Sequence, residues 1–385
     1  MNWLKLYRLA LVPVAAFAIA LIRLLRLPVR FGTIWGSRLG HMAGNMECYL
    51  CEREAGLSNG WDFFYYHGEP FNTQLDKMLR RVVRVDRTQF VYVCNVVNQL
   101  FEGWQAHRID TLQVDRDINN LFEQQPAHLS FTAKEEARGA AGLRALGIPK
   151  GAKWVYLIVR DSAKHPHLPY HSYRNTDIDT YEQAALALAE RGYYVIRMGA
   201  KVAKPLKVNH PRVIDYASRG QDDFMAVYLG AHCAFCLSSG TGPDAIPVIF
   251  RRPVCYVNYV PLEYLQTYHK GSLAIWKHHM KDGKRMTLAE IYESKAGHFM
   301  AAEDFEAAGI TLVDNTPEEI KAAALEMADR IEDKRACNKK NGPEAFRRQE
   351  EFWAKFPRGV SAFNNGPLHG RINMRIGAEF LKGYQ

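Results

Sequence analysis

The sequence predicts an α/β protein whose second half forms a doubly wound, Rossmann-like domain. Of its 385 residues 48% are hydrophobic, which is enough apolar material to pack a sizeable core. The run Trp154–Val159 is continuously apolar, as in a strand buried on both faces of a parallel sheet. From about 151 to 330, apolar strands alternate with helical segments, the order of a βαβ fold.

The first 28 residues predict a helix at a membrane surface. Leu9–Ile22 is an unbroken apolar run, but as a helix it would reach only roughly 21 Å, short of the ~30 Å hydrocarbon core of a bilayer. Basic residues fall in one sector of the helical wheel: Lys5, Arg8, Arg23 and Arg26. We therefore expect 1–28 to be an amphipathic anchor lying in the plane of an anionic membrane. A short span, a signal peptide and an ordinary buried helix are the alternatives.

The charge and the cysteines indicate a cytoplasmic protein that does not bind nucleic acid. The net charge is +9, and six basic residues precede the first acidic residue, Glu47, so the rest of the chain is nearly balanced. A nucleic-acid binder would instead carry its basic residues across a folded face. The seven cysteines, an odd number without a framework spacing, predict small buried side chains. We expect the protein to be peripheral or monotopic at the cytoplasmic face of the inner membrane.

Residues 29–150 predict an N-terminal Rossmann-like domain. Its predicted elements are strands at 29–35 and 61–66 and helices at 72–81 and 132–147. The last of these helices opens with the capping box Thr132-Ala-Lys-Glu135. The Pro/Gly stretch Ile148–Gly151 is the predicted domain boundary.

Residues 151–330 predict the second domain, and 331–385 a helical tail that packs back on the first. The predicted strands are 154–159, 193–197, 213–216, 234–237, 254–257 and 310–313. The predicted helices are 177–191, 222–229 and 243–250, followed by one that opens at the capping box Thr316–Glu319.

The turn Ser238-Ser239-Gly240-Thr241-Gly242 predicts a phosphate site. It follows a buried strand and precedes Pro243 at the first position of a helix. Small residues let backbone N–H groups approach a ligand, and a helix N-terminus favours an anion. Arg160 and Arg197 end neighbouring strands and would add bidentate phosphate contacts. The alternatives are a simple tight turn and surface salt bridges.

Three further residues are the catalytic candidates. His41 follows the first strand of the N-terminal half and would act as a general base for an acceptor hydroxyl. The alternative is a histidine that bonds the backbone at a helix start. Asp161 and Arg174 lie in a long loop at the ligand edge of the sheet, where loops are often functional. Asp177-Ile-Asp179 matches a metal-binding D-x-D pattern, but it opens a helix and is interpreted as capping, so no metal is expected.

Several segments together resemble a bacterial family of GT-B-like glycosyltransferases associated with surface-polysaccharide genes. They are RLGHMAGNMECYL, VRDS with YHSYRNTDIDTY, GYYVIRMG, SSGTGPDAIP and RIGAEFL, and they span most of 35–385. The resemblance implies a GT-B fold, in which two Rossmann-like domains face each other across a cleft. The first would bind the acceptor and the second the nucleotide-sugar.

On this resemblance the residues Ser238–Gly242 would hold the donor phosphates, and Arg160 or Arg197 the charge of the leaving group. Asp244 or Glu263 would reach the ribose. The donor would be a nucleotide-sugar and the acceptor a lipid-linked or surface glycan, with no cofactor or metal. The E-x7-E pattern of many retaining enzymes is absent, so inversion is slightly favoured. The alternatives are an enzyme like a nucleotide-sugar 2-epimerase and a non-catalytic nucleotide-sugar-binding component.

Overall fold

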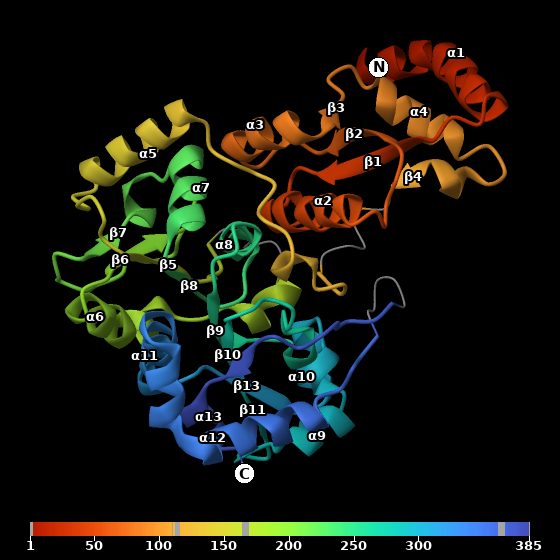
Figure 1. The fold of residues 1–385 in the computed structure, drawn as a ribbon. Helices are drawn as coiled ribbons and strands as arrows, with labels where there is room; N and C mark the ends of the chain where they lie inside the picture. The colour runs from red at the N-terminus through yellow and green to blue at the C-terminus, as the bar shows by residue number, and fades with distance from the viewer. Residues whose placement is uncertain (1–2, 110, 112–115, 164–168, 361–365, 385) are drawn as a thin grey trace.

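The computed structural model describes residues 3–109, 111, 116–163, 169–360 and 366–384. It has two α/β lobes, each built on a parallel sheet (Figure 1). The N-terminal lobe is red to orange in the figure, and the larger C-terminal lobe runs from yellow-green to blue.

The N-terminal lobe is a small Rossmann-like unit with the strand order β3-β2-β1-β4, all parallel. β1 and β2 match the predicted strands, and Asn72 caps α3 by accepting a hydrogen bond from the Leu75 N–H at 2.8 Å. The elements are α1 Trp3–Leu24, β1 Val29–Trp35, α2 Met46–Glu54, β2 Trp61–His67, α3 Thr73–Val82, β3 Arg84–Val85, α4 Phe90–Asn98 and β4 Arg108–Ile109.

Helices cover both faces of this small sheet. α1 and α4 pack on one face, where Ala15 and Ile19 of α1 meet Phe31 and Val91. α2 and α3 cover the other face, which is turned toward the C-terminal lobe (Figure 1). α1 is thus part of the folded lobe.

α1 corrects one detail of the predicted anchor. Two of the four basic residues of its wheel, Arg8 and Arg23, face the lobe: the guanidinium of Arg8 donates to Gln89 Oε1 at 2.7 and 3.1 Å, and that of Arg23 donates to Asn98 Oδ1 and to the Glu102 carbonyl. The apolar side of the helix faces outward instead.

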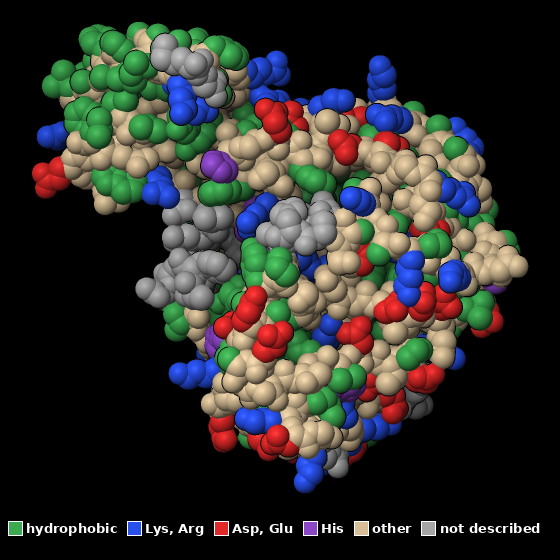
Figure 2. Space-filling view, turned by 180° about the vertical axis from the view of Figure 1, so that it is seen from behind, with side chains coloured by type: hydrophobic (Ala, Val, Ile, Leu, Met, Phe, Trp, Pro, Cys, Tyr) green, Lys and Arg blue, Asp and Glu red, His purple; other side chains and the backbone are tan. Residues whose placement is uncertain are grey.

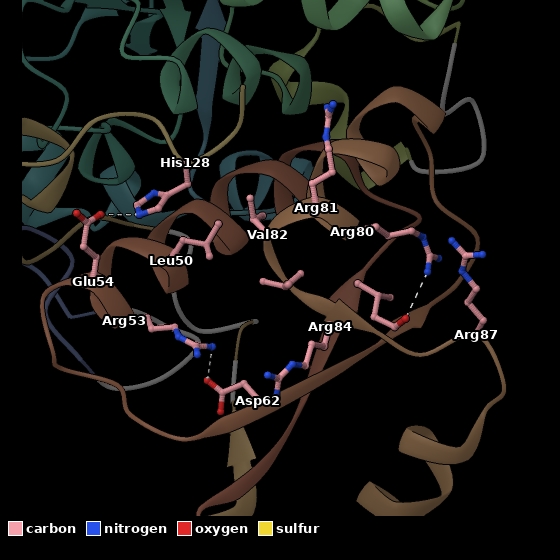
Figure 3. A pocket seen from close by; sticks show the side chains of 12 residues that line it. Leu50, Arg53, Glu54, Asp62, Arg80, Arg81, Val82, Arg84, Arg87 and His128 are labelled. Carbon is pink, nitrogen blue, oxygen red and sulfur yellow. Dashed lines mark hydrogen bonds and ion pairs between the residues drawn. The ribbon is translucent and has the colours of Figure 1, made fainter. Parts of the chain in front are cut away.

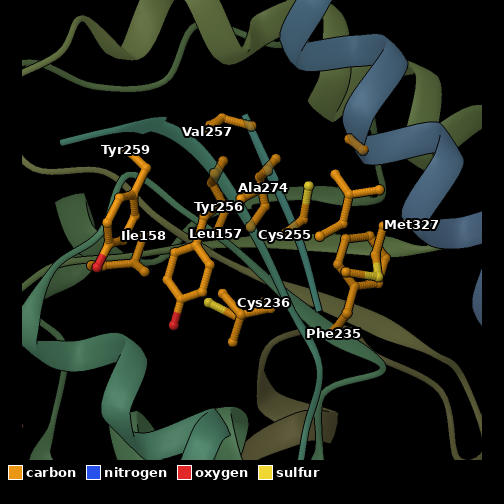
Figure 4. Close-up of a cluster of buried hydrophobic side chains, with 14 of the residues drawn as sticks. Leu157, Ile158, Phe235, Cys236, Cys255, Tyr256, Val257, Tyr259, Ala274 and Met327 are labelled. Atoms are coloured by element: carbon orange, nitrogen blue, oxygen red, sulfur yellow. The ribbon is translucent and has the colours of Figure 1, made fainter. Parts of the chain in front are cut away.

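The C-terminal lobe has a seven-stranded sheet in the order β14-β10-β9-β8-β5-β6-β7, all parallel. The chain begins at the central β5, runs out through β6 and β7, and then returns to build the other half from β8. This is the doubly wound arrangement predicted from the sequence. Figure 4 shows its core, where Leu157, Phe235 and Tyr256 pack without solvent contact and Met327 of α11 closes one face.

Most elements of this lobe lie where the sequence predicts them. They are β5 Trp154–Ile158, α6 Glu182–Glu190, β6 Tyr194–Met198, β7 Val213–Asp215, α7 Asp223–His232, β8 Phe235–Ser238, α8 Ala245–Ile249, β9 Val254–Tyr259 and α11 Pro317–Glu332. Three further elements were not predicted: β10 Leu273–Trp276, α9 Leu288–Glu293 and α10 Ala302–Ala307. The capping boxes at Thr132 and Thr316 are confirmed. The seven cysteines are all buried and free, as predicted.

The strand predicted at 310–313 forms, but it does not join the main sheet. As β13 (Ile310–Val313) it pairs antiparallel with β11 (His278–Lys281), which also pairs with β12 (Lys284–Arg285). The reason is that β10 continues almost directly into β11, so the chain leaves the parallel sheet before β13 is reached. β13 shows alternating burial, typical of a strand in a small sheet that is covered on one side.

The predicted domain boundary at Ile148–Gly151 comes too late in the sequence. The helix α5 (Ala133–Ala145), assigned by sequence to the first domain, packs on α7 of the C-terminal lobe (Figure 1). Gly139 and Gly142 allow this close approach, since a Cβ at Gly139 would lie 2.1 Å from the ring of Tyr228 and one at Gly142 2.3 Å from the sulfur of Met225. The chain therefore crosses between the lobes before α5.

The substitution Gly139→Ala tests this docking of α5. Alanine is the better helix former by about 1 kcal/mol, so on an undocked helix the variant would be more stable. We expect the opposite, a loss of about 1–3 kcal/mol in the free energy of unfolding, because the methyl group overlaps the Tyr228 ring. Urea denaturation measures it, with the exposed Ala137→Gly as a control that loses only the helix propensity. A stabilised Gly139→Ala protein would contradict the packing described.

The stretch 368–371 of the predicted tail meets residues of the predicted first domain, because the Leu368 carbonyl accepts from Arg116 Nε and the Arg371 carbonyl from Asn120 Nδ2. The helices and the strand of the tail, however, pack on the C-terminal lobe and not, as predicted for 331–385, on the N-terminal domain. These are α12 Lys334–Lys355, β14 Arg375–Ile376 and α13 Ala378–Lys382. β14 extends the C-terminal sheet by pairing with β10, and Phe352 and Phe380 pack around the fully buried ring of Trp276. Apolar burial against this ring fixes the tail on its own lobe.

The two lobes share a packed interface. Val227, Ile246 and Ile249 of the C-terminal lobe belong to the same buried cluster as Ile34 and Met42 of the N-terminal lobe. Asn72 and Thr73 at the start of α3 bond to Asp223 at the start of α7. The interface thus brings the carboxyl end of β1 against the turn that follows β8.

Candidate functional site

A cavity of about 480 Å³ lies between the lobes at the carboxyl ends of the strands. Its C-terminal wall comes from residues that follow β5 and β8, the neighbouring strands at which the chain reverses direction across the sheet. Its N-terminal wall comes from Ser37–Asn45, which follow β1, and from Phe71 and Asn72. Ligands of open α/β sheets bind at such switch points.

The turn after β8 is open to this cavity. Gly240, Thr241 and Gly242 line it, and Gly240 has a φ of 75°, where a Cβ would also lie 3.0 Å from the Tyr259 ring. Gly242 touches Gly40 of the facing lobe, so that a Cβ on Gly40 would be 3.1 Å from the Gly242 Cα. Glycine is required at these positions by conformation and by close approach.

The two serines of the turn do not line the cavity. Ser238 is buried, and its hydroxyl donates to Asp244 Oδ2 at 2.7 Å and accepts from the Gly240 N–H at 3.0 Å. The hydroxyl of Ser239, also buried, accepts from the Arg160 N–H at 2.8 Å. Both serines shape the turn, so within the predicted phosphate site Gly240–Gly242 border the cavity and the two serines do not.

Arg160 and Arg174 carry positive charge at the cavity wall. Arg174 Nη2 donates to the Gly240 carbonyl at 2.5 Å, which ties the 169–174 segment to the turn. Burial, reinforced by the neighbouring Arg174, lowers the pKa of Arg160 to about 10. Two guanidinium groups side by side in a partly dry site repel each other, and an anion between them relieves that repulsion.

Three buried donors at this wall have no hydrogen-bond partner in the part of the chain that the structure describes. They are the Nε atoms of Arg160 and Arg174 and the hydroxyl of Thr241. Unpartnered Nε atoms also occur elsewhere in the described chain, for example at Arg330 and Arg375, so what distinguishes these three donors is that they lie together at one cavity, where a ligand would pair them. Donors alone, with no acceptor among them apart from a hydroxyl, indicate an anion such as a phosphate.

Asp244 supports the turn from below. Its Oδ2 accepts from the Ser238 hydroxyl and, at 2.7 Å, from the Thr241 N–H. Burial raises the pKa of Asp244 from 3.8 to about 6, against the opposing pull of these bonds and of Arg174. Asp244 borders the cavity, yet it serves as a cap of the helical turn that follows, so its predicted contact with the ribose finds no support in this geometry.

The raised pKa of Asp244 gives a pH-dependent stability. The folded state binds the proton more tightly than the unfolded chain, so the free energy of unfolding is highest below pH 4 and falls as pH rises through 6, by about 3 kcal/mol at most. Asp244→Asn keeps the side-chain shape and removes this contribution. We expect wild type to lose stability relative to the variant as pH rises from 4 to 7.5, as measured by urea denaturation at each pH. A difference that stays flat with pH would contradict the assignment.

His41 occupies the opposite wall. It begins a π-helical turn, His41–Asn45, a few residues after β1, and such a turn often marks a functional site. Asn45 Nδ2 donates to the Thr111 carbonyl at 2.6 Å and lies 3.3 Å from His41 Nδ1. The structure therefore brings His41 to the cavity from the N-terminal lobe.

Asp161 also borders the cavity, but its carboxylate is occupied. Oδ1 accepts from the Ala163 N–H at 2.9 Å and Oδ2 from the Ala203 N–H at 2.8 Å. Asp161 thus joins the loops that follow β5 and β6. This is a positioning role, whereas the sequence predicted a catalytic one.

Arg197 and Glu263 lie away from the cavity, contrary to prediction. Arg197 is 1% exposed within β6; its Nη1 donates to the Lys204 carbonyl at 2.6 Å and lies 3.5 Å from Asp215. Glu263 is buried, its Oε2 lies 2.6 Å from His298 Nε2, and burial raises its pKa to about 7. A strand side chain can point away from a ligand edge even when its backbone ends there, and this is the case for Arg197.

The sequence analysis missed several wall residues. Lys201 follows β6 at the same sheet edge as Arg160, and the position after a predicted strand could have indicated it. Arg38 follows β1 on the other lobe. Aromatic and amide side chains also line the cavity, and no local pattern marks them: Tyr156, Gln221, Tyr259, Gln266 and Tyr268.

Potential metal ligands in the described residues gather outside this cavity. Glu47, Cys51 and His128 come within ligand distance of one another. The guanidinium of Arg251, however, lies among them, with Nη2 2.6 Å from Glu47 Oε1 and 3.6 Å from Cys51 Sγ, so a cation already fills the position. Asp177 accepts from the Asp179 N–H, which is the predicted capping role. Lys204 forms ion pairs with the carboxylates of Asp177 and Asp179 at 2.6 Å.

Comparison with known proteins gives similarity of fold. No protein-family model matches the chain, and no curated protein sequence matches it. Among solved structures it is similar to the E. coli ADP-heptose LPS heptosyltransferase II (12% identity, 78% of this chain and 100% of that one, TM-score 0.41). It is also similar to a glycosyl transferase family 9 protein of Veillonella parvula (7% identity, 60% of this chain and 80% of that one, TM-score 0.40). A third similar structure is that of the dodecameric iron-containing heptosyltransferase TibC of enterotoxigenic E. coli, in complex with ADP-D-beta-D-heptose (12% identity, 81% of this chain and 77% of that one, TM-score 0.40). All these TM-scores lie below 0.5, and at that level a similarity says nothing about the reaction.

Proposed function

We propose that this protein is a glycosyltransferase that moves a sugar from a nucleotide-sugar to a lipid-linked or surface-glycan acceptor. The observation that carries the proposal is the cluster of unpartnered donors, Arg160, Arg174 and Thr241, beside the exposed glycine turn at the switch point of the sheet. A diphosphate has the charge and the acceptors that these groups lack.

The proposed roles follow from the two walls. The Thr241 hydroxyl, the Gly242 N–H and the Arg160 guanidinium hold the diphosphate, since the N–H groups of Gly240 and Thr241 are bonded within the turn, and Arg174 keeps the turn in place through the Gly240 carbonyl. These fixed positive groups stabilise the charge that develops on the departing diphosphate, a contribution of about 3–4 kcal/mol for a single well-placed donor. No cofactor enters this proposal.

The reaction proposed is a displacement at the anomeric carbon. The acceptor oxygen forms a bond to that carbon, the bond from the carbon to the diphosphate oxygen breaks, and the nucleoside diphosphate leaves. His41 takes the proton of the acceptor hydroxyl. Because His41 stands on the lobe facing the diphosphate turn, attack from the side opposite the leaving group, with inversion, is the favoured course.

The Asn45 contact bears on the proton state of His41. A hydrogen bond from Asn45 to Nδ1 favours the neutral ring with its proton on Nε2, whereas a base acting through Nε2 needs that atom unprotonated. A hydrogen bond of 3.3 Å is worth about 1 kcal/mol or less, while general base catalysis contributes about 10²–10⁴-fold in rate. The free-energy cost of moving the proton from Nε2 to Nδ1 is therefore small compared with the rate gained from general base catalysis.

A thermal-shift screen with UDP, GDP, ADP, CDP and CMP tests the proposal. We expect one nucleotide to raise the melting temperature, by binding the folded state, and its sugar conjugates to do the same. Incubation of the matching nucleotide-sugar should then release nucleoside diphosphate only with an acceptor present. Epimerised donor without acceptor would favour the 2-epimerase alternative, and binding without turnover a non-catalytic component. No stabilisation by any nucleotide would refute the proposal.

A further inference from the structure

The outward side of α1 is an unpartnered apolar surface. Trp3, Phe17 and Leu24 are each more than 70% exposed, and among the described residues only Ala15 and Ile19 of this helix are buried. Figure 2 shows apolar side chains gathered over this lobe, in contrast to the mixed charges on the rest of that face. Contiguous apolar patches of this kind mark interaction sites on soluble proteins.

The contacts of α1 decide how it would meet a membrane. It is the one helix in the described part of the chain that is long and apolar enough to cross a bilayer. Its inner side, however, is packed on the sheet and α4, and Arg8 and Arg23 are hydrogen-bonded to that lobe at the two ends of the helix. Spanning would break these contacts, whereas lying in the bilayer surface keeps them and buries only the apolar side.

The surface continues past α1 at its C-terminal end. Arg23 stacks over the ring of Phe101 at 5.2 Å, and the neighbouring Leu100, just after α4, is 82% exposed. Leu100 thus lies beside the exposed Leu24 and Leu25 at the end of α1 and enlarges the same apolar region. The tip of α4 therefore joins α1 in the docking surface.

Positive charge lies at the other end of α1. Arg8 bonds to Gln89, so the N-terminal part of the helix adjoins the segment from β3 to α4 that carries Arg84 and Arg87. These two line an open groove of about 770 Å³ together with Arg53, Arg80 and Arg81 (Figure 3). The last three are paired with carboxylates, whereas Arg84 and Arg87 have no ion pair in the described chain.

We propose that α1 and the tip of α4 form an in-plane docking surface for an anionic bilayer, with Arg84, stacked over Phe63 on the α1 side of the sheet, and Arg87 attracting phosphate headgroups at its rim. The partner is inferred from complementarity: an all-apolar helix face suits acyl chains, and unpaired exposed cations beside it suit anionic lipid. Lys5 in the first turn of α1 and Arg26 just after its last residue are exposed and have no ion pair among the described residues, and they add to the same attraction. The inference does not depend on glycosyl transfer.

Sedimentation with liposomes tests the apolar part. Vesicles of phosphatidylcholine with phosphatidylglycerol should bind the full-length protein, and Phe17→Glu should lower the partition coefficient about tenfold or more, since a buried phenylalanine contributes about 1.5–3 kcal/mol. Leu186→Glu on the remote helix α6, 39% exposed, is the matched control and should bind as wild type. Unchanged binding of Phe17→Glu would overturn the proposal.

The charged part has its own variants. The double variant Arg84→Glu with Arg87→Glu should lower binding to anionic vesicles by about tenfold or more, at roughly 1 kcal/mol per charge removed, and the loss should shrink in high salt. The double variant Lys150→Glu with Lys270→Glu reverses two exposed lysines of the other lobe as the control. Equal binding of wild type to pure phosphatidylcholine and to anionic vesicles would overturn the role given to Arg84 and Arg87.

A second copy of the chain is the competing occupant. Analytical ultracentrifugation without lipid should show the same oligomeric state for wild type and Phe17→Glu. A dimer that the substitution abolishes, together with no vesicle binding by wild type, would overturn the membrane assignment. Nucleotide-induced thermal stabilisation should be the same in all these variants. Failure of membrane docking is thereby separated from failure of the glycosyltransferase proposal.

Discussion

Arg160→Ala should lower kcat/KM for the nucleotide-sugar about 100-fold or more and abolish most of the thermal stabilisation by the nucleotide. The guanidinium lies at the cavity wall with its Nε buried and unpartnered, so it has little to hold it there except an anion. Loss of one preorganised donor to a developing negative charge costs about 10²–10³-fold. Since burial and Arg174 lower its pKa to about 10, removing the charge should also relieve repulsion and leave the free protein no less stable.

Matched variants separate this role from general charge effects. Arg219→Ala removes an exposed arginine of the same lobe and should change neither binding nor rate. Arg160→Lys keeps the charge but loses the planar pair of donors, so it should recover only part of the activity. Isothermal titration and steady-state rates measure both. If Arg160→Ala bound nucleotide as well as wild type, the diphosphate would not lie at this wall.

His41→Ala should lower kcat about 100-fold while donor binding stays unchanged, because a general base contributes about 10²–10⁴-fold and acts on the acceptor. The rate should lose the rise with pH that titration of an imidazole produces. Asn45→Ala removes the long hydrogen bond to Nδ1 and should leave kcat within about threefold, a change that corresponds to less than 1 kcal/mol.

The pH profile distinguishes a base from a positioning residue. A His41→Gln variant keeps a side chain that can orient an acceptor by hydrogen bonding but cannot take its proton. If His41→Gln retained both the wild-type rate and the wild-type pH profile, another group would be the base. If His41→Ala lost donor binding as well, His41 would belong to the diphosphate site.

The parts of the fold that the sequence predicted are those fixed by local chemistry. Trp154–Val159 reads as a buried strand because every side chain is apolar, and the boxes at Thr132 and Thr316 begin helices through contacts three residues apart. The glycine turn after β8 was predictable for the same reason: its conformation and exposure follow from residues adjacent in sequence.

The errors involve contacts between distant residues. β13 and β14 are short strands whose partners, β11 and β10, are set by the path of the chain after Trp276. α5 packs on α7 through two glycines whose partners, Tyr228 and Met225, lie more than 80 residues away. Arg197 was placed by the end of its strand, but the direction of its side chain depends on the 204–215 segment that covers it.

The structure of a complex with the nucleoside diphosphate selected by the screen is the most direct test of the central claim. We expect diphosphate oxygens within hydrogen-bonding distance of the Gly242 amide, the Thr241 hydroxyl and the Arg160 guanidinium, which would give partners to the Thr241 hydroxyl and the Arg160 Nε. A nucleotide bound elsewhere, with this turn untouched, would contradict it.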